Sequence, residues 1–193
     1  MKLAIVDVGC GNIGSVAIAL ERFGVSPLIT GEAEEIASAD KVILPGVGAA
    51  GYAMEQIEQR GLAPLLRSLT QPALGICLGM QLLFGCSEEE DTACLGIIPG
   101  EVRKLDSAPG RPVPHMGWSR LTLQDETIGL RSGDYVYFAH SFACPNGQQT
   151  VASAEYGGII PAAVRSGNWL GAQFHPERSG GAGARFLERF LAG

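Results

Sequence analysis

The stretch Gly75-Ile76-Cys77-Leu78-Gly79-Met80-Gln81 decides the fold. A cysteine stands between two glycines, after the apolar run Ala73–Ile76 and before a helical pattern. This arrangement is typical of a nucleophile elbow, a strand-to-helix turn so tight that the residues two before and two after the nucleophile are best without a Cβ. We therefore predict a buried strand over Ala73–Ile76 and a helix over Met80–Phe84, with the Cys77 thiol presented at the carboxyl end of the strand.

Outward from this elbow, apolar runs alternate with helical patterns through the first half of the chain. The expected strands are Leu3–Val8, Pro27–Thr30 and Lys41–Leu44, and the expected helices are Val16–Phe23, Gly51–Gln59 and Pro64–Leu69. Near-continuously apolar strands that alternate with helices predict an open, mostly parallel sheet with helices on both faces. In the second half, short strand-like runs and turns such as Ser166-Gly167-Asn168 predict antiparallel strands. Since no linker or repeat interrupts the pattern, we expect a single α/β domain over residues 1–193.

Composition excludes several classes of protein. The formal net charge is −6, and the longest basic run is Arg103-Lys104, which argues against a nucleic-acid surface. No apolar run approaches the ~20 residues that cross a bilayer, and the N-terminus does not have the shape of a signal peptide. Five cysteines at irregular spacing fit reduced thiols of the cytoplasm, and Cys86 and Cys94 lack the spacing of a zinc site. We expect a cytoplasmic protein without a metal.

The sequence His175-Pro176-Glu177 is the second candidate site, directly after the apolar run Trp169–Phe174. An imidazole can serve as a base for Cys77, and a carboxylate two residues on can orient that imidazole. Taken separately, the cysteine could be a small core residue and Glu177 a solvated surface residue. Together they predict covalent acyl transfer.

A glycine-rich loop, Pro45-Gly46-Val47-Gly48, follows the expected third strand. Its backbone N–H groups could supply one donor of an oxyanion hole, the other being the N–H of Leu78. An ordinary turn is the alternative.

Three other features allow more than one interpretation. Gly9-Cys10-Gly11-Asn12-Ile13-Gly14, with Glu32 further on, matches a dinucleotide-binding pattern and makes a nucleotide-dependent oxidoreductase the main rival, although that class does not account for Cys77 or His175. His115 and His140 lie in aromatic-rich segments where a structural histidine is the default. Trp118 could belong to the core or anchor an interface.

Taken together, the Gly75–Gly79 elbow, His175-Pro176-Glu177 and Pro45–Gly48 resemble the class I (triad) glutamine amidotransferases. Within that family, Pro114-His115-Met116-Gly117-Trp118 and Tyr137-Phe138-Ala139-His140-Ser141 resemble the glutaminase subunits of imidazole glycerol phosphate synthases. The resemblance covers essentially the whole chain. It departs from the family at Val8, where an aromatic residue is usual.

The resemblance implies a role for particular residues. Cys77 would be the nucleophile, His175 the base and then the acid, and Glu177 the group that orients His175. Val47 and Leu78 would form the oxyanion hole. The substrate glutamine would be held by residues of the loop, the helix and a later strand: Gly46, Gly48, Gln81, Ser141 and Phe142. Trp118 and Asn12 would lie at the interface with a partner.

The same resemblance implies hydrolysis of L-glutamine to glutamate and ammonia, with no cofactor. The ammonia would pass to a separate cyclase chain with a (β/α)8 barrel fold, in a heterodimer that makes imidazole glycerol phosphate and an aminoimidazole carboxamide ribotide for histidine biosynthesis. Little activity is implied without that partner. A glutaminase subunit of another synthase, such as the pyridoxal 5'-phosphate synthase, is the alternative within the family, and a non-catalytic binding module is the alternative outside it.

Overall fold

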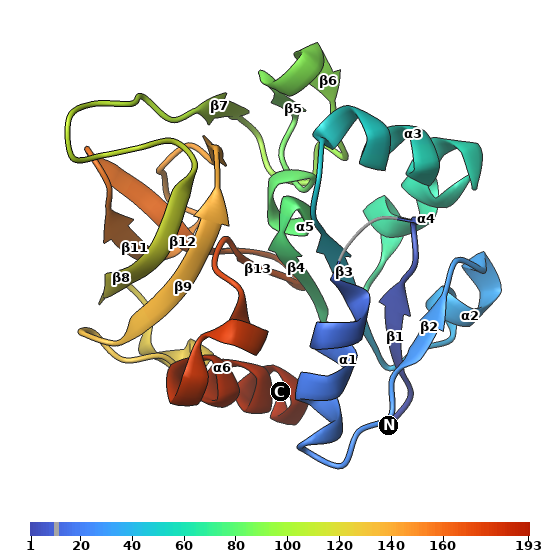
Figure 1. Cartoon of the computed structure of the whole chain (residues 1–193). Helices are drawn as coiled ribbons and strands as arrows, with labels where there is room; N and C mark the ends of the chain where they lie inside the picture. Colours follow the sequence, from blue (N-terminus) through green and yellow to red (C-terminus); the bar gives the residue numbers. More distant parts are fainter. Residues whose placement is uncertain (10–11) are drawn as a thin grey trace.

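A computed structural model describes residues 1–9 and 12–193. Its main sheet has nine strands in the order β2-β1-β3-β4-β13-β12-β11-β8-β9 (Figure 1). The first five of these are parallel and the remainder antiparallel. The bounds are β1 Leu3–Val6, β2 Leu28–Thr30, β3 Lys41–Gly46, β4 Ala73–Cys77, β8 His115–Leu123, β9 Tyr135–His140, β11 Thr150–Glu155, β12 Ile159–Ser166 and β13 Trp169–Ala172.

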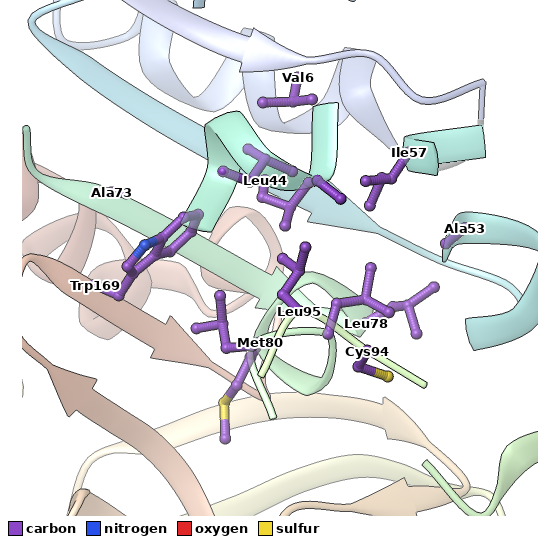
Figure 2. Packing of buried hydrophobic residues seen from close by; sticks show 14 of the residues in the cluster. Val6, Leu44, Ala53, Ile57, Ala73, Leu78, Met80, Cys94, Leu95 and Trp169 are labelled. Carbon is purple, nitrogen blue, oxygen red and sulfur yellow. The ribbon is translucent and has the colours of Figure 1, made fainter. Parts of the chain in front are cut away.

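Helices cover both faces of the parallel half. They are α1 Ile13–Glu21, α2 Ala33–Ala37, α3 Ala50–Gln59, α4 Leu62–Ser68, α5 Leu78–Gln81 and α6 Gly180–Ala192. Successive residues of one strand point to opposite faces, so Leu3 and Ile5 pack with α1 and α6, while Ala4 and Val6 pack with α2, α3 and α4. Figure 2 shows Val6, Leu44 and Ile57 meeting on the second of these faces. The expected α/β fold is confirmed.

A second, small sheet lies beside the carboxyl ends of β3 and β4 (Figure 1). Its strands, in the order β10-β7-β5-β6, are β10 Phe142–Ala143, β7 Glu101–Lys104, β5 Cys86–Ser87 and β6 Thr92–Ala93. The one-turn 3-10 helix η1 (Glu89–Asp91) joins β5 to β6. This sheet brings Glu89 and Phe142 to the edge where the elbow lies.

Several expected boundaries differ from the observed ones. The helix after the elbow is α5, which begins at Leu78 instead of Met80, directly after the cysteine. Helix α1 begins at Ile13 instead of Val16, and the side chain of Asn12 before it makes no capping hydrogen bond. Cys10 and Gly11 of the N-terminal glycine motif lie outside the described residues.

Candidate active site

Cys77 is the last residue of β4 and lies in a conformation that L-residues rarely adopt, with φ 54° and ψ −109°. The flanking glycines make this turn possible because backbone packs where their side chains would be. A Cβ on Gly75 would lie 2.6 Å from the Gly79 carbonyl oxygen, and a Cβ on Gly79 would lie 1.8 Å from the Leu44 carbonyl oxygen. The elbow predicted from the glycine spacing is therefore present.

The neighbouring parallel strand brings His175 to the same edge of the sheet. Ala172 of β13 pairs with Ile76 of β4, so the chain beyond each strand leaves at the same end. The His175 N–H donates to the Tyr137 carbonyl at 2.9 Å, and the buried Ser179 hydroxyl donates to the His175 carbonyl at 2.7 Å. These bonds fix the backbone from which the imidazole projects.

Glu177 orients that imidazole. It lies in the 3-10 helix η3 (Pro176–Arg178), and its Oε1 is 2.9 Å from His175 Nδ1. Both side chains are shielded, with exposed fractions of 2% for Glu177 and 9% for His175. Because a carboxylate accepts, Nδ1 carries the proton, and Nε2 is the nitrogen left to act on a neighbouring group.

The pKa of His175 is raised to about 10. Burial is the largest single influence and acts to lower it, but hydrogen bonds and charge interactions with Cys77 and Glu177 together outweigh burial. The imidazole is therefore held as its cation at neutral pH, between the sulfur and the carboxylate.

A pocket with about 530 Å³ of empty space opens in front of Cys77. Its walls include seven of the residues singled out in the sequence, namely Val47, Gly48, Cys77, Leu78, Gln81, Ser141 and Phe142. Gly46 lies behind the elbow and pairs with Cys77 in the sheet, and its Cβ would meet Leu78 Cβ at 2.9 Å. Gly46 thus fits a packing role, whereas Gly48, with φ 101° and open space around it, shapes the loop.

Buried amides connect the pocket wall to the sulfur. Gln81 Nε2 donates to the Phe142 carbonyl at 2.8 Å and to Gln173 Oε1 at 3.0 Å, and Gln173 Nε2 lies 3.8 Å from Cys77 Sγ. Sequence reasoning missed Gln173, which is fully buried. The signal was present, because Gln173 is the one polar residue in the apolar run before His175.

Glu89 was also missed. It lines the pocket, and its Oε2 accepts from the Ala50 N–H at 2.8 Å, the first residue of α3. In the sequence it is hidden in the acidic run Glu88–Asp91, which is typical of a solvated surface. A carboxylate facing a pocket of this size can bind an ammonium group.

The two residues expected at an interface lie away from this pocket. Trp118 of β8 is 54% exposed and packs edge-on against Tyr137 of β9, with ring centroids 6.0 Å apart. Met116 and Tyr135, also on these two strands, are 64% and 56% exposed. Trp118 is therefore a surface residue and not part of the core. Asn12 precedes α1 and is half-buried.

Within residues 1–9 and 12–193, no cluster of three or more His, Cys, Asp or Glu side chains is arranged to hold a metal ion. None of the helices described is both long enough and apolar enough to span a bilayer. Cys77, Cys86, Cys94 and Cys144 are free thiols.

The fold and this cysteine–histidine–glutamate site define a class of enzymes that transfer the amide nitrogen of glutamine. The family model of the class-I glutamine amidotransferases matches residues 4–193, and the chain belongs to that family. Membership of this family excludes a nucleotide-dependent oxidoreductase, which was the main alternative function suggested by the sequence.

Two relatives within this family carry the name of one particular synthase subunit. The chain is 50% identical over 192 residues to the imidazole glycerol phosphate synthase subunit HisH of Idiomarina loihiensis, with 99% of this chain and 97% of the relative covered. It is 49% identical over 192 residues to the subunit HisH of Xanthomonas campestris, covering 98% and 96%. The resemblance noted in the sequence is confirmed.

Solved structures agree on the fold. A crystal structure described as a glutamine amidotransferase has a TM-score of 0.78 at 21% identity, covering 100% of this chain and 98% of its own. A putative GMP synthase protein from Thermoplasma acidophilum has a TM-score of 0.77 at 20% identity, covering 100% and 92%.

Proposed function

We propose that this chain is the glutaminase subunit of an imidazole glycerol phosphate synthase of the cytoplasm. It would hydrolyse L-glutamine to glutamate and ammonia and deliver the ammonia to a cyclase, with which it would form a heterodimer. The observation that carries the chemistry is the meeting of Cys77 and His175 at the ends of adjacent parallel strands, with Glu177 2.9 Å from His175. The names of the relatives support the choice of synthase over one that makes pyridoxal 5'-phosphate.

The reaction begins when the Cys77 thiolate attacks the side-chain carbonyl carbon of glutamine. A C–S bond forms, and the N–H groups of Leu78 and Val47 stabilise the oxyanion. His175 then gives its Nε2 proton to the amide nitrogen, the C–N bond breaks, and ammonia leaves. Water, deprotonated by His175, attacks the resulting thioester, the C–S bond breaks, and glutamate is released with the thiolate restored.

The charges of the pocket suit the α-groups of glutamine. Glu89 would pair with the α-ammonium group. The Phe142 carbonyl already accepts from Gln81, and the Ser141 carbonyl accepts from the Leu105 N–H at 2.8 Å. A carboxylate only accepts hydrogen bonds, so the N–H groups of the Ser141–Phe142 segment are the main-chain groups that would hold the α-carboxylate.

The partner would dock on the exposed aromatic face of β8 and β9 that carries Met116, Trp118 and Tyr135. Exposed aromatic and methionine side chains are the residues most enriched at protein interfaces. Asn12, ahead of α1, is the second proposed contact.

Glutamate release tests the proposal. It would be measured with the chain alone, with the cyclase, and with the cyclase plus its nucleotide substrate. We expect a large rise in the last mixture. Labelling of Cys77 by a glutamine analogue without activity in any mixture would keep the glutaminase chemistry and overturn the choice of synthase, whereas the absence of both would overturn the chemistry.

A further inference from the structure

Two buried histidines, which the reaction above does not use, are joined beside the glutamine pocket. His115 lies on β8 and His140 at the end of β9, and the two residues pair across these strands. His115 Nδ1 is 3.0 Å from His140 Nε2, and the exposed fractions of the residues are 3% and 5%. His140 also lines the pocket itself.

The donor and the acceptor can be assigned for each hydrogen bond of the two histidines. His140 Nδ1 lies 2.7 Å from the Phe142 carbonyl oxygen, which can only accept, so Nδ1 carries the proton and His140 Nε2 is an acceptor. The bond between the rings must then come from His115 Nδ1–H. His115 Nε2 becomes the acceptor for the Ser119 hydroxyl, 2.9 Å away. One backbone carbonyl thus sets both tautomers.

This arrangement requires a neutral His140, because a proton added to its Nε2 would place two N–H groups face to face between the rings. A proton added to His115 would go on its Nε2 and reverse the hydrogen bond from Ser119. Burial lowers the pKa of His115 to about 4. Burial also lowers that of His140 to about 4, aided by the charges of His115 and His175 and opposed by the bond to Phe142. The rings of Phe138 and Tyr156 stack against His115.

The Phe142 carbonyl is where this chain of hydrogen bonds meets the active site. It accepts from His140 on one side and from Gln81 on the other, and Gln81 leads through Gln173 to the Cys77 sulfur. On β9, the strand that carries His140, the Ala139 carbonyl oxygen lies 4.0 Å from Cys77 Sγ. A change at His140 therefore moves the pocket wall that faces the substrate.

We infer that His140, supported by His115, is a positioning residue for glutamine: the neutral pair holds the Phe142 carbonyl, and with it the Ser141–Phe142 wall of the pocket, in the place that binds substrate. This inference rests on the proposed glutaminase function. Neither histidine touches the reacting atoms, so the pair acts on substrate binding and leaves the reactivity of Cys77 to His175.

Two amide substitutions at His140 distinguish the role of its Nδ1 from that of its Nε2. The side-chain nitrogen of Asn lies near the place of a histidine Nδ1, and that of Gln near the place of Nε2. His140→Asn therefore keeps the donor to Phe142, while His140→Gln loses it. Ser153→Ala removes a half-buried hydrogen bond, 3.1 Å long, from Gln124 Nε2 to Ser153 Oγ on the neighbouring strand β11. It is the control for a general loss of stability.

The readout, taken with the cyclase and its nucleotide substrate present, is the saturable labelling of Cys77 by the glutamine analogue diazo-oxo-norleucine. Labelling by iodoacetamide, which needs no glutamine pocket, is measured in parallel. We expect His140→Gln to raise the analogue concentration for half-maximal labelling about tenfold, as loss of one hydrogen bond predicts. His140→Asn and Ser153→Ala should stay within about threefold, and the iodoacetamide rate should not change.

Each outcome decides one claim. If the unaltered chain is not labelled by the analogue, the proposed glutaminase function fails, and the positioning role fails with it. If the unaltered chain is labelled and His140→Gln matches it, the positioning role alone is overturned. Equal weakening by His140→Gln and Ser153→Ala would also overturn it, because stability alone would then account for the effect.

Discussion

At the scale of single residues, Glu177 helps to set the pH up to which His175 keeps its positive charge. Its hydrogen bond and charge are among the influences that raise the pKa of His175 to about 10. Glu177→Gln keeps an acceptor for Nδ1 and removes the charge. We expect the alkaline limb of kcat/KM for glutamine to move to lower pH and kcat to fall about 10²-fold or more. The pH profile with the partner present measures both, and an unshifted limb would contradict the assignment of Glu177.

Candidate residues that have a diagnostic neighbour in the sequence were easier to find than residues defined by contacts with distant parts of the chain. Cys77 and His175 stand out because each follows an apolar run and has a diagnostic neighbour. Gln173 and Glu89 act through contacts with residues far away in the chain, such as Gln81 and Ala50. Only the folded structure brings those partners together, so no local pattern could assign their roles.

At the scale of elements, the elbow tolerates no side chain at its second glycine. Gly79→Ala would drive a Cβ to 1.8 Å from the Leu44 carbonyl oxygen, where backbone must shift. We expect a loss of at least about 3 kcal/mol in the free energy of unfolding, measured by denaturant titration. Gly14→Ala is the matched control, since it lies in α1 with no atom within 4 Å of its Cβ.

The control variant Gly14→Ala should have a higher free energy of unfolding than the unaltered chain. An alanine in place of an exposed helical glycine stabilises by about 0.5–1 kcal/mol. Equal stability of the two variants would contradict the packing seen at the elbow.

The β8–β9 hairpin carries the second prediction at this scale. Trp118→Ala should weaken binding of the cyclase by about 2 kcal/mol or more, a roughly thirtyfold rise in Kd, if Trp118 is an anchor of the interface. Ile159→Ala removes an apolar side chain of similar exposure, 60% against 54%, on a different strand. Titration calorimetry with both variants checks the assignment, and equal Kd values would contradict it.

Elements were predicted well where one physical signal was strong. The buried strands β1, β3 and β4 were found from continuous apolar runs, because both faces of a parallel sheet are covered. Strand β8, which begins at His115, gives a weaker signal in the sequence. After the buried His115, its first half alternates exposed with half-buried residues and contains Gly117, and it pairs with β9, which no local pattern reveals. The two-residue strands of the small sheet are likewise set by long-range pairing.

At the scale of the whole molecule, three histidines with shifted pKa values shape the dependence of stability on pH. His115 and His140 have pKa values lowered to about 4 from 6.5, so the unfolded chain binds more protons and stability falls as the pH drops from 6.5 to 4. His175, with its pKa raised to about 10, stabilises below 6.5 and loses that contribution as the pH rises through 10.

The pH range in which His115 and His140 lower the stability and the range in which His175 loses its stabilising effect meet near pH 6.5. We expect the contribution of the three histidines to the free energy of unfolding to be greatest there. Denaturant midpoints between about pH 4 and 10 measure it. The double variant His115→Asn/His140→Asn should flatten the acidic side alone, and Glu177→Gln should flatten the alkaline side alone. A variant that altered both sides equally would contradict the separate origins.

The order of the strands also has a consequence for synthesis on the ribosome. Strand β13 is the last strand of the main sheet to be made, yet it lies between β4 and β12, where the parallel half meets the antiparallel half. A nascent chain that has passed β4 holds the thiol, but the imidazole arrives only when every strand of the sheet has been translated. An unfinished chain therefore lacks the pairing of Cys77 with His175, since the two side chains meet only when the last strand closes the sheet.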